Sequence, residues 1–350
     1  MGPATGGSAE VGGMTVLFDF MRDEASHGAG PSSGARRVLV TGGDGFLGRG
    51  VVRTLAALPR FEVVSLDVRE VPAERRAPGV TYRTQDVRDP LLLDTLREHA
   101  IDTVVHLASI VTPGRDSDRA FEHSVDVGGS RNVIEACVAA GVRQLVVSSS
   151  GAAYGYYADN PEWLVETDAL RGNVAFAYSD HKRQVEELLA EFRHSAPQLQ
   201  QTVLRIGTIL GATVNNQITA LFEKKALLAI RGSASPFVFI WDEDVTAIIV
   251  RAVTTRRAGV FNVAGDGALG IRELAALLGK PVRELPAALL RAALAVGHAL
   301  RISRYGPEQL DFLRYRPVLD NARLKSEFGY RPAKTSREAF EAWMLARGLQ

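Results

Sequence analysis

The chain has 350 residues, of which 46% are hydrophobic, and a formal net charge of +1. This length and composition suit one large domain or two fused domains with a sizeable core. A charge near zero, with no basic tract interleaved with aromatic residues, gives no electrostatic case for a nucleic-acid partner. The single cysteine, Cys137, leaves no disulfide framework, so we predict a cytoplasmic protein. The seven histidines have no ligand spacing, and no metal site is predicted.

Two segments bear on targeting and membranes. Residues 1–35 are rich in Gly, Ser and Ala, and we predict a mobile leader rather than a secretion signal. The longest apolar stretch, residues 287–300, is interrupted by Arg291 and His298 and is shorter than the ~20 residues that span a bilayer. Burial or contact with a partner, a homodimer being one candidate, is therefore preferred over stable membrane insertion.

Short β-branched runs alternate with helical patterns from Arg37 onward. Six runs are predicted as buried strands: 37–41, 62–67, 81–86, 102–109, 143–150 and 202–207. Residues 91–100 and 130–141 between them have a helical period. This alternation is typical of an α/β fold with a Rossmann-type, doubly wound parallel sheet. Ligands of such sheets bind at the carboxyl ends of the strands.

The first predicted strand runs straight into a glycine-rich turn, "TGGDGFLG", and a helix that begins near Phe46. Glycine lets the chain turn tightly and lets its backbone approach a pyrophosphate, which the positive end of the helix attracts. The pattern therefore predicts a dinucleotide site. Its predicted contacts are Gly42, Gly45, Phe46, Leu47 and Gly48.

Asp67 closes the next strand nineteen residues after Gly48. A carboxylate at this spacing suits the two hydroxyls of a ribose and repels a 2′-phosphate. NAD is therefore favoured over NADP. Arg69, two positions later, keeps NADP as the alternative.

Lys182 is the first of only six lysines in the chain. The apolar residues around it recur at steps of three and four, which predicts a helix in which Tyr178, Lys182, Val185 and Leu189 share an inward face. A nearby ammonium group favours the phenolate form of a tyrosine. Tyr178 and Lys182 are therefore a candidate acid–base pair.

After Gly211 the pattern of predicted elements changes to longer helical segments with isolated strands, as in residues 237–253 and 259–267. We predict a Rossmann domain at 36–210, which binds NAD and carries the catalytic residues. A smaller, mainly helical lobe at 211–350 would bind the substrate. The chain is free to cross between the two.

Together these residues resemble the extended short-chain dehydrogenase/reductase family, also called NAD-dependent epimerase/dehydratases. The segments "QDVRD", "HLAS" and "SSSGAAYG" at 85–89, 106–109 and 148–155 are also similar to family motifs. Further similar segments extend the resemblance over roughly residues 36–345: they lie at 204–211, 243–253, 261–267 and 319–332.

The resemblance implies a role for each matching residue. Tyr178 would pass a proton to or from the substrate oxygen, which Ser150 would hold. Lys182 would favour the phenolate and bind the nicotinamide ribose. The remaining implied cofactor contacts are Asp86 and Val87 at the adenine, and Leu107, Ala108 and Ser109 along the ribose and phosphates.

Three departures from the family pattern concern the substrate. An Arg-Asp pair common in nucleotide-sugar enzymes reads Phe237-Val238, and two family asparagines read Asp126 and Thr208. Apolar residues cannot neutralise a diphosphate, which favours a substrate without a nucleotide group. Candidate replacement cations are Arg231, Arg301, Arg304 and Arg316.

The leading functional prediction is an NAD-dependent oxidoreductase that acts on a secondary alcohol or ketone of a small molecule. The first alternative is a nucleotide-sugar epimerase with retained NAD, and the second is a redox sensor that binds NAD without turnover. Dehydration is disfavoured because Gly151 and Ala152, rather than acids, follow Ser150.

Overall fold

The computed structural model describes residues 34–111, 118–300, 306–307 and 309–349. The predicted leader, up to residue 33, lies outside the described residues, as do Arg301 and Arg304. In the described part of the chain, no helix combines the length and the apolar character that crossing a membrane requires.

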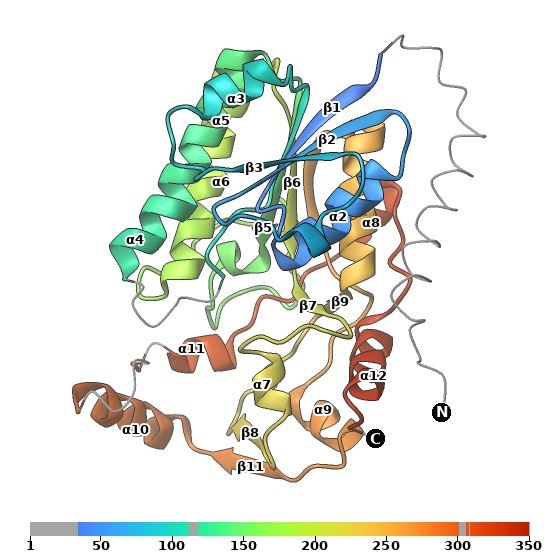
Figure 1. The fold of residues 1–350 in the computed structure, drawn as a ribbon. Coiled ribbons are helices and arrows are strands. Elements are labelled where there is room, and N and C mark those ends of the chain that lie inside the picture. The colour runs from blue at the N-terminus through green and yellow to red at the C-terminus, as the bar shows by residue number, and fades with distance from the viewer. Residues whose placement is uncertain (1–33, 112–117, 301–305, 308, 350) are drawn as a thin grey trace, which may run out of the picture.

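The centre of the molecule is a sheet of seven parallel strands in the order β10-β6-β5-β4-β1-β2-β3 (Figure 1). This order reverses direction between β1 and β4, as a doubly wound sheet requires, and confirms the predicted fold class. The strands are β1 (Arg36–Thr41), β2 (Phe61–Asp67), β3 (Val80–Thr84), β4 (Thr103–His106), β5 (Gln144–Ser150), β6 (Gln200–Ile206) and β10 (Gly259–Val263).

All six strands predicted between residues 37 and 207 form, but one is not buried. The third, β3, has no buried residue, because it lies at the edge of the sheet with β2 as its only neighbour. The prediction of a buried strand at 81–86 is therefore wrong in burial and right in type.

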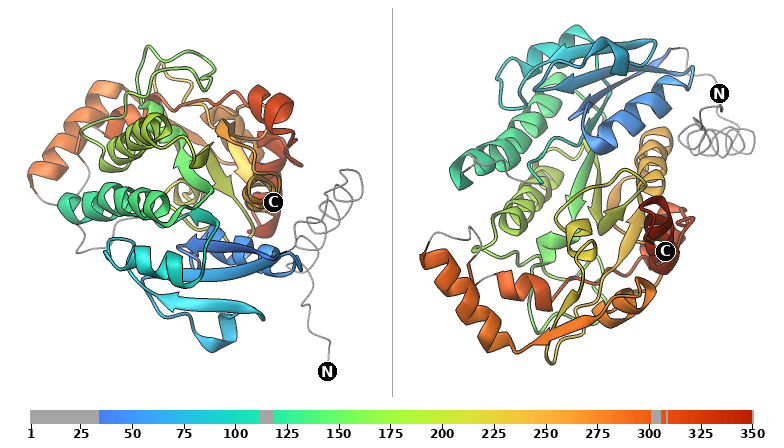
Figure 2. Two further views of the ribbon diagram at one scale, coloured as in Figure 1. Left: turned by 90° about the horizontal axis from the view of Figure 1, so that it is seen from above. Right: turned by 60° about the horizontal axis from the view of Figure 1, so that its bottom comes forward.

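Helices cover both faces of the sheet (Figure 2). On one face α2 and α8 pack together over a core of valine, leucine and isoleucine side chains. On the other face α3, α5 and α6 cover a second apolar cluster. The bounds are α2 (Phe46–Ala56), α3 (Leu92–Glu98), α4 (Arg119–His123), α5 (Gly129–Ala140), α6 (Ala177–Ser195) and α8 (Asp242–Thr255), with 3₁₀ turns at Ala73–Arg75 and Gly151–Tyr154 and a π-helical turn at Ser124–Gly128 between α4 and α5.

The chain crosses between the two predicted domains. Residues 259–263 form β10, which pairs with β6 at the edge of the main sheet, and α8 packs on that sheet beside α2. Both come from beyond residue 210. The first structural unit therefore needs residues from both sides of the predicted boundary.

The smaller lobe lies beyond the carboxyl ends of the strands (Figure 1). Its core is aromatic, with Phe222, Phe239, Phe340 and Trp343 fully buried. Its elements are β7 (Thr208–Leu210), α7 (Thr219–Phe222), β8 (Leu227–Ile230), β9 (Phe239–Trp241), α9 (Ile271–Leu277), β11 (Val282–Leu285), α10 (Ala287–Ala299), α11 (Gln309–Arg314), a π-helical turn (Leu324–Phe328) and α12 (Ser336–Ala346).

Helix α10 differs from its prediction. Its sequence is strongly apolar, yet Leu289 and Val296 are 57% and 58% exposed, and none of its described side chains is buried. Burial of this segment in the core, as expected from its composition, is therefore wrong. Contact with a partner stays a prediction.

Candidate active site

The glycine loop is tight at each predicted glycine. Gly42 has a φ of +66°, and a Cβ there would lie 2.9 Å from the backbone nitrogen of Ala108. A Cβ on Gly45 would lie 2.9 Å from the Gly42 carbonyl oxygen, and one on Gly48 would overlap that oxygen. Only glycine fits these positions. The loop thus brings bare backbone to the start of α2, as a pyrophosphate site needs.

Asp67 ties this loop to the end of β2. Its buried carboxylate accepts hydrogen bonds from the backbone nitrogens of Asp44, at 3.1 Å, and Arg69, at 3.2 Å. The sequence analysis missed Asp44, a second buried carboxylate here, which pairs with Arg75 at 3.0 Å. Two carboxylates at this end of the loop oppose a 2′-phosphate.

Asp86 and Val87, the two residues expected at the adenine, already have protein partners for some of their polar groups. Asp86 accepts hydrogen bonds from the backbone and guanidinium of Arg88, which hold the pKa of Asp86 below its ordinary value. Val87 is buried against Gly129, and its carbonyl accepts from Asn132. A contact between Val87 and the cofactor would therefore use its backbone nitrogen.

His106, at the end of β4, joins three elements. Its Nδ1 lies 2.8 Å from Thr41 Oγ1 and its Nε2 lies 3.0 Å from Ser130 Oγ. Burial, together with the charge of Lys182, lowers the pKa of His106 to about 4. The ring is therefore neutral near pH 7 and holds the strand end in place. It begins the segment that contains Leu107, Ala108 and Ser109.

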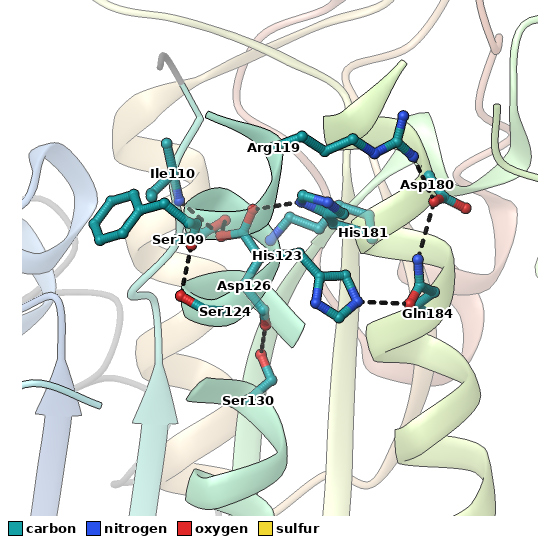
Figure 3. A network of polar contacts seen from close by, with 12 residues as sticks. Ser109, Ile110, Arg119, His123, Ser124, Asp126, Ser130, Asp180, His181 and Gln184 are labelled. Atoms are coloured by element: carbon teal, nitrogen blue, oxygen red, sulfur yellow. Dashed lines mark hydrogen bonds and ion pairs between the residues drawn. The ribbon is translucent and has the colours of Figure 1, made fainter. Parts of the chain in front are cut away.

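A buried Asp–His pair fixes the end of that segment (Figure 3). The Asp126 carboxylate accepts from Ser109 Oγ at 3.0 Å and from the Ile110 nitrogen at 2.8 Å. Its other oxygen lies 3.2 Å from His181 Nδ1. Both residues are almost fully buried, and His181 Nε2 has no hydrogen-bond partner among the described groups. The pair links the cofactor segment to α6, next to Lys182.

The charge of Asp126 is compensated from several sides. Burial alone would raise its pKa, but the hydrogen bonds from His181, Ile110 and Ser109 and the charge of Lys182 together hold the pKa below its ordinary value. The π-helical turn at Ser124–Gly128 contains this residue, and such turns often occur at functional sites. In the sequence, the only signal was that Asp126 replaces a family asparagine.

The predicted inward face of α6 is confirmed. Lys182, Val185 and Leu189 are buried and Tyr178 is half-buried. Lys182 Nζ donates to the Ser148 carbonyl at 3.1 Å and lies 5.7 Å from the centre of the Tyr178 ring. Lys182 forms no ion pair with any described carboxylate, and the Tyr178 hydroxyl forms no hydrogen bond with any described group. Both polar groups are therefore available to a ligand.

Ser150 is the last residue of β5, two residues after Ser148, whose carbonyl accepts from Lys182. The Ser150 Oγ accepts from the Ala152 nitrogen at 3.1 Å, which leaves its own hydrogen free to donate. Ser149 has a different role, because it is buried and donates to Glu186 at 2.5 Å. At the end of β5, the hydroxyl of Ser150 can therefore donate to a ligand, whereas that of Ser149 is already used by Glu186.

Tyr154 is a structural tyrosine. It is fully buried, and its hydroxyl lies 2.9 Å from Asn262 Oδ1 and accepts from Arg205 at 2.8 Å. Burial raises its pKa to about 12, so it is not a proton carrier near neutral pH. Arg205 also binds the Glu186 carboxylate, at 2.7 Å and 2.9 Å. This buried pair anchors α6, one turn beyond Lys182, to β6.

Arg316 provides a cation on the lobe side. Its guanidinium lies 4.0 Å from the ring centre of Phe237 and 4.5 Å from that of Phe312, and its Nε is buried without a hydrogen-bond partner among the described groups. Burial lowers its pKa to about 10, which leaves it charged near neutral pH. Phe312 packs at 5.4 Å on Phe176, two residues before Tyr178. The cation therefore borders the start of α6 without a described carboxylate as partner.

Two further features concern metal ligands and the thiol. No group of three or more His, Cys, Asp or Glu side chains is arranged to hold a metal ion in the described ranges. Cys137 is fully buried in α5, and burial raises the pKa of its thiol. A buried thiol of this kind is unreactive.

A glycine loop at the first helix, a carboxylate at the end of β2 and a Tyr–Lys pair at the open edge define a Rossmann-type dinucleotide enzyme. The sequence model of the NAD dependent epimerase/dehydratase family matches residues 38–264. The chain belongs to this family of NAD-dependent enzymes, which confirms the predicted family and cofactor.

Related sequences agree with the family without fixing the reaction. An uncharacterized protein of Mycobacterium tuberculosis is 26% identical over 316 residues, which cover 89% of this chain and 84% of that protein. UDP-glucose 4-epimerase of Yersinia enterocolitica is 30% identical over 185 residues, which cover 50% of this chain and 54% of that enzyme.

Solved structures share the fold. UDP-glucose 4-epimerase of Thermotoga maritima with UDP-glucose has a TM-score of 0.67 at 20% identity, covering 90% of this chain and all of that one. UDP-glucose 4-epimerase of Thermus thermophilus in complex with NAD has a TM-score of 0.66 at 24% identity, covering 89% of this chain and 99% of that one.

Proposed function

We propose that the protein transfers a hydride between NAD and a secondary alcohol or ketone carbon of a small molecule. The observation that supports this proposal is that Lys182 lies 5.7 Å from the Tyr178 ring and donates to the carbonyl of Ser148, two residues before Ser150 at the end of β5. Tyr178, Lys182 and Ser150 each keep a polar group free for a ligand, which a purely structural trio would not. A redox sensor without turnover has no need of this arrangement.

NAD, when bound, supplies the hydride acceptor or donor, a chemistry that side chains lack. In alcohol oxidation, Tyr178 takes the proton of the substrate hydroxyl, and in ketone reduction it gives a proton to the carbonyl oxygen. The ammonium of Lys182 favours the phenolate. Ser150 donates a hydrogen bond to the substrate oxygen and so stabilises the charge that develops there.

The cofactor residues support NAD over NADP. Asp67 and Asp44 are buried carboxylates at the ribose end of the loop, and the nearby Arg75 is paired with Asp44. A 2′-phosphate would meet the negative charge of Asp67, while the exposed Arg69 is the one nearby cation that supports the NADP alternative. Leu107 and Ala108 lie next to Gly42 of the loop, and Ser109 follows them, which supports the proposed contacts with the ribose and phosphates.

A second candidate is epimerisation of a nucleotide sugar, and one observation favours it. Phe237 and Val238 are buried, so the usual Arg-Asp position offers no charge, but the guanidinium of Arg316 lies over Phe237. A cation at this position suits a phosphate group. Dehydration is disfavoured, because Ala152 is buried and Gly151 packs against Leu319, with no acid at either position.

One experiment separates the candidates. Purified protein is dialysed, denatured and assayed for released nucleotide, and the melting temperature is measured with UDP, UDP-glucose and a panel of alcohols and ketones. A dehydrogenase should lose NAD on dialysis and reduce added NAD with an alcohol. An epimerase should retain NAD and be stabilised by UDP, since a ligand that binds only the folded state raises the melting temperature. Failure of both, with no NAD bound, would overturn the proposal.

A further inference from the structure

An aromatic cluster joins the start of α6 to the smaller lobe. The ring centre of Phe312 lies 5.1 Å from that of Tyr156 and 5.4 Å from that of Phe176. Phe312 belongs to α11, which in Figure 1 lies beyond the carboxyl ends of the strands, on the side of the smaller lobe. Phe176 immediately precedes α6, two positions before Tyr178. The cluster therefore brings α11 next to the proposed proton carrier.

Tyr156 reaches this cluster from the end of β5. After the 3₁₀ turn at Gly151–Tyr154, the chain passes through Gly155, whose φ is +86°. The Tyr156 nitrogen then donates to Asn173 Oδ1 at 2.7 Å, which fixes the backbone. The side chain is 8% exposed, and its hydroxyl forms no hydrogen bond with any described group. Tyr156 is therefore held firmly while its hydroxyl keeps a hydrogen to donate.

Arg316 lies on the same cluster without a counter-charge. Its guanidinium is stacked between Phe237, at 4.0 Å, and Phe312, at 4.5 Å, and these rings offer no acceptor oxygen. Its Nε is buried without a hydrogen-bond partner, and no ion pair joins Arg316 to a described carboxylate. Because unpaired buried polar groups cost free energy, this arrangement favours an acceptor supplied by a ligand.

Arg316, Tyr156 and Tyr178 are also close electrostatically. Burial raises the pKa of Tyr156, the positive charge of Arg316 lowers it, and a negative charge on Tyr178 raises it. Burial lowers the pKa of Arg316 to about 10, and Tyr156 is the one described group whose charge opposes this. Because such effects weaken with distance, Tyr156 lies near both Arg316 and Tyr178.

We propose that Arg316 and the Tyr156 hydroxyl bind an anionic group of the substrate, while Tyr178 acts on a secondary alcohol or ketone of the same molecule. The anionic group is a carboxylate or a phosphate monoester. This inference rests on the function proposed above and names the chemical class of its substrate. A guanidinium binds either group through two parallel hydrogen bonds, and a hydroxyl adds a third. One guanidinium balances one such group rather than a nucleotide diphosphate.

Calorimetric titration of the full chain tests the proposal with two matched pairs of probes. Saturating NADH occupies the cofactor site and forms no product with an alcohol. 3-Hydroxybutyrate has a carboxylate where 1,3-butanediol has a hydroxymethyl group, and glycerol 3-phosphate is compared with glycerol. At least one anion should bind about tenfold or more tightly than its neutral partner, and that pair identifies the anionic group. Equal affinities within both pairs would overturn the proposal.

Variants locate the site, although the comparison of probes on the unchanged protein does not depend on their folding. Arg316→Gln should bring the affinities of the preferred anion and its neutral partner to within about twofold of each other, and Tyr156→Phe should reduce the preference by about threefold or more. Arg231→Gln is the matched control, because Arg231 is an exposed arginine of the same lobe, 3.7 Å from Glu284. It should keep the wild-type preference. An equal loss in this control would indicate nonspecific charge attraction and contradict the proposal.

Turnover separates this inference from the proposed function. With NAD in place of NADH, the absorbance of NADH follows oxidation of each probe. An anion preference without NADH formation would support the anion site and count against hydride transfer. Equal kcat/KM for 3-hydroxybutyrate and 1,3-butanediol would support hydride transfer and contradict the anion site. UDP binding that is tighter than that of either anion and is lost in Arg316→Gln would assign the guanidinium to a diphosphate and overturn the proposal.

Discussion

Tyr178 carries the most direct prediction at the scale of the residue. Tyr178→Phe should lower turnover by ~10² or more, the usual contribution of a positioned acid or base. Its folding and NAD affinity should stay near those of the wild type, because the hydroxyl bonds to no described group. Lys182→Ala should lose turnover and cofactor affinity together. Steady-state kinetics and NADH fluorescence titration measure both effects.

Tyr154→Phe is the matched control for Tyr178→Phe. Its hydroxyl is buried among Arg205 and Asn262, so its removal should lower the melting temperature rather than the chemical rate. Wild-type turnover in Tyr178→Phe, or a loss of turnover without loss of stability in Tyr154→Phe, would exchange the assigned roles of the two tyrosines.

Asp67 should set the choice of cofactor. Asp67→Ala removes a carboxylate that opposes a 2′-phosphate, so NAD affinity should fall and the ratio of the NADP to the NAD dissociation constant should drop by about tenfold or more. Asp67→Asn keeps an acceptor for the Asp44 nitrogen and controls for damage to the loop. An equal loss for both cofactors in both variants would point to that damage instead.

His106 predicts a pH dependence of stability. Its pKa of about 4 in the folded chain is below the ordinary value near 6.5, so between these values the unfolded chain binds a proton that the folded chain does not. This contribution is present above pH 6.5 and is lost as the pH falls toward 4. It amounts to roughly 2 kcal/mol between about pH 7.5 and about pH 5.

Urea unfolding at these two pH values tests His106. The wild type should lose about that much more free energy of unfolding than His106→Gln, which cannot take up the proton. His194→Gln changes an exposed histidine on α6 and should behave as the wild type. The same loss in all three proteins would assign the pH dependence to other groups.

Local pattern found some site residues and could not find others. Tyr178 and Lys182 lie four positions apart in one helix, so periodicity alone placed them on one face. Asp126 and His181 are separated by 55 positions, and no local signal pairs a given acid with a given histidine. Arg316 was one of four candidate cations, and only the fold shows its guanidinium lying over Phe237.

At the scale of the element, the position of α6 depends on Glu186. Glu186→Gln leaves the buried Arg205 without its counter-charge and should lower the free energy of unfolding by about 3–5 kcal/mol. The neighbouring Glu187 forms an exposed pair with Arg183, so Glu187→Gln should change it by less than about 0.5 kcal/mol. The free energies of unfolding are measured by urea unfolding. Similar changes in the two variants would contradict the proposal that the Glu186–Arg205 pair anchors α6.

The sequence predicted which segments form helices or strands better than it predicted where these elements lie in the fold. The β-branched runs indicated the strands correctly, but β3 lies at an edge and β10 joins the main sheet, because strand order depends on long-range pairing. Helix α10 is apolar in sequence, yet none of its described side chains is buried. An apolar composition shows which residues are favourable to bury. Whether they are buried depends on the elements that pack against them.

At the scale of the whole molecule, the predicted Rossmann domain at 36–210 should not fold without the residues that follow it. A fragment of residues 34–210 lacks α8 and β10, which supply much of the core on one face of the sheet. It should show no cooperative thermal transition by circular dichroism, whereas residues 34–350 should show one. A cooperative transition in the shorter fragment would mean that residues 34–210 form an independent domain.

The late return of β10 has a consequence for synthesis on the ribosome. The outer edge of β6 stays open until about 50 more residues have been translated, which takes ~3–10 s at the usual elongation rates. An unpaired strand edge of this kind is a template for association between nascent chains. Slower translation of residues 207–258 would lengthen that exposure, so the soluble yield of the protein should depend on codon usage in this stretch more than in the stretch that encodes α12.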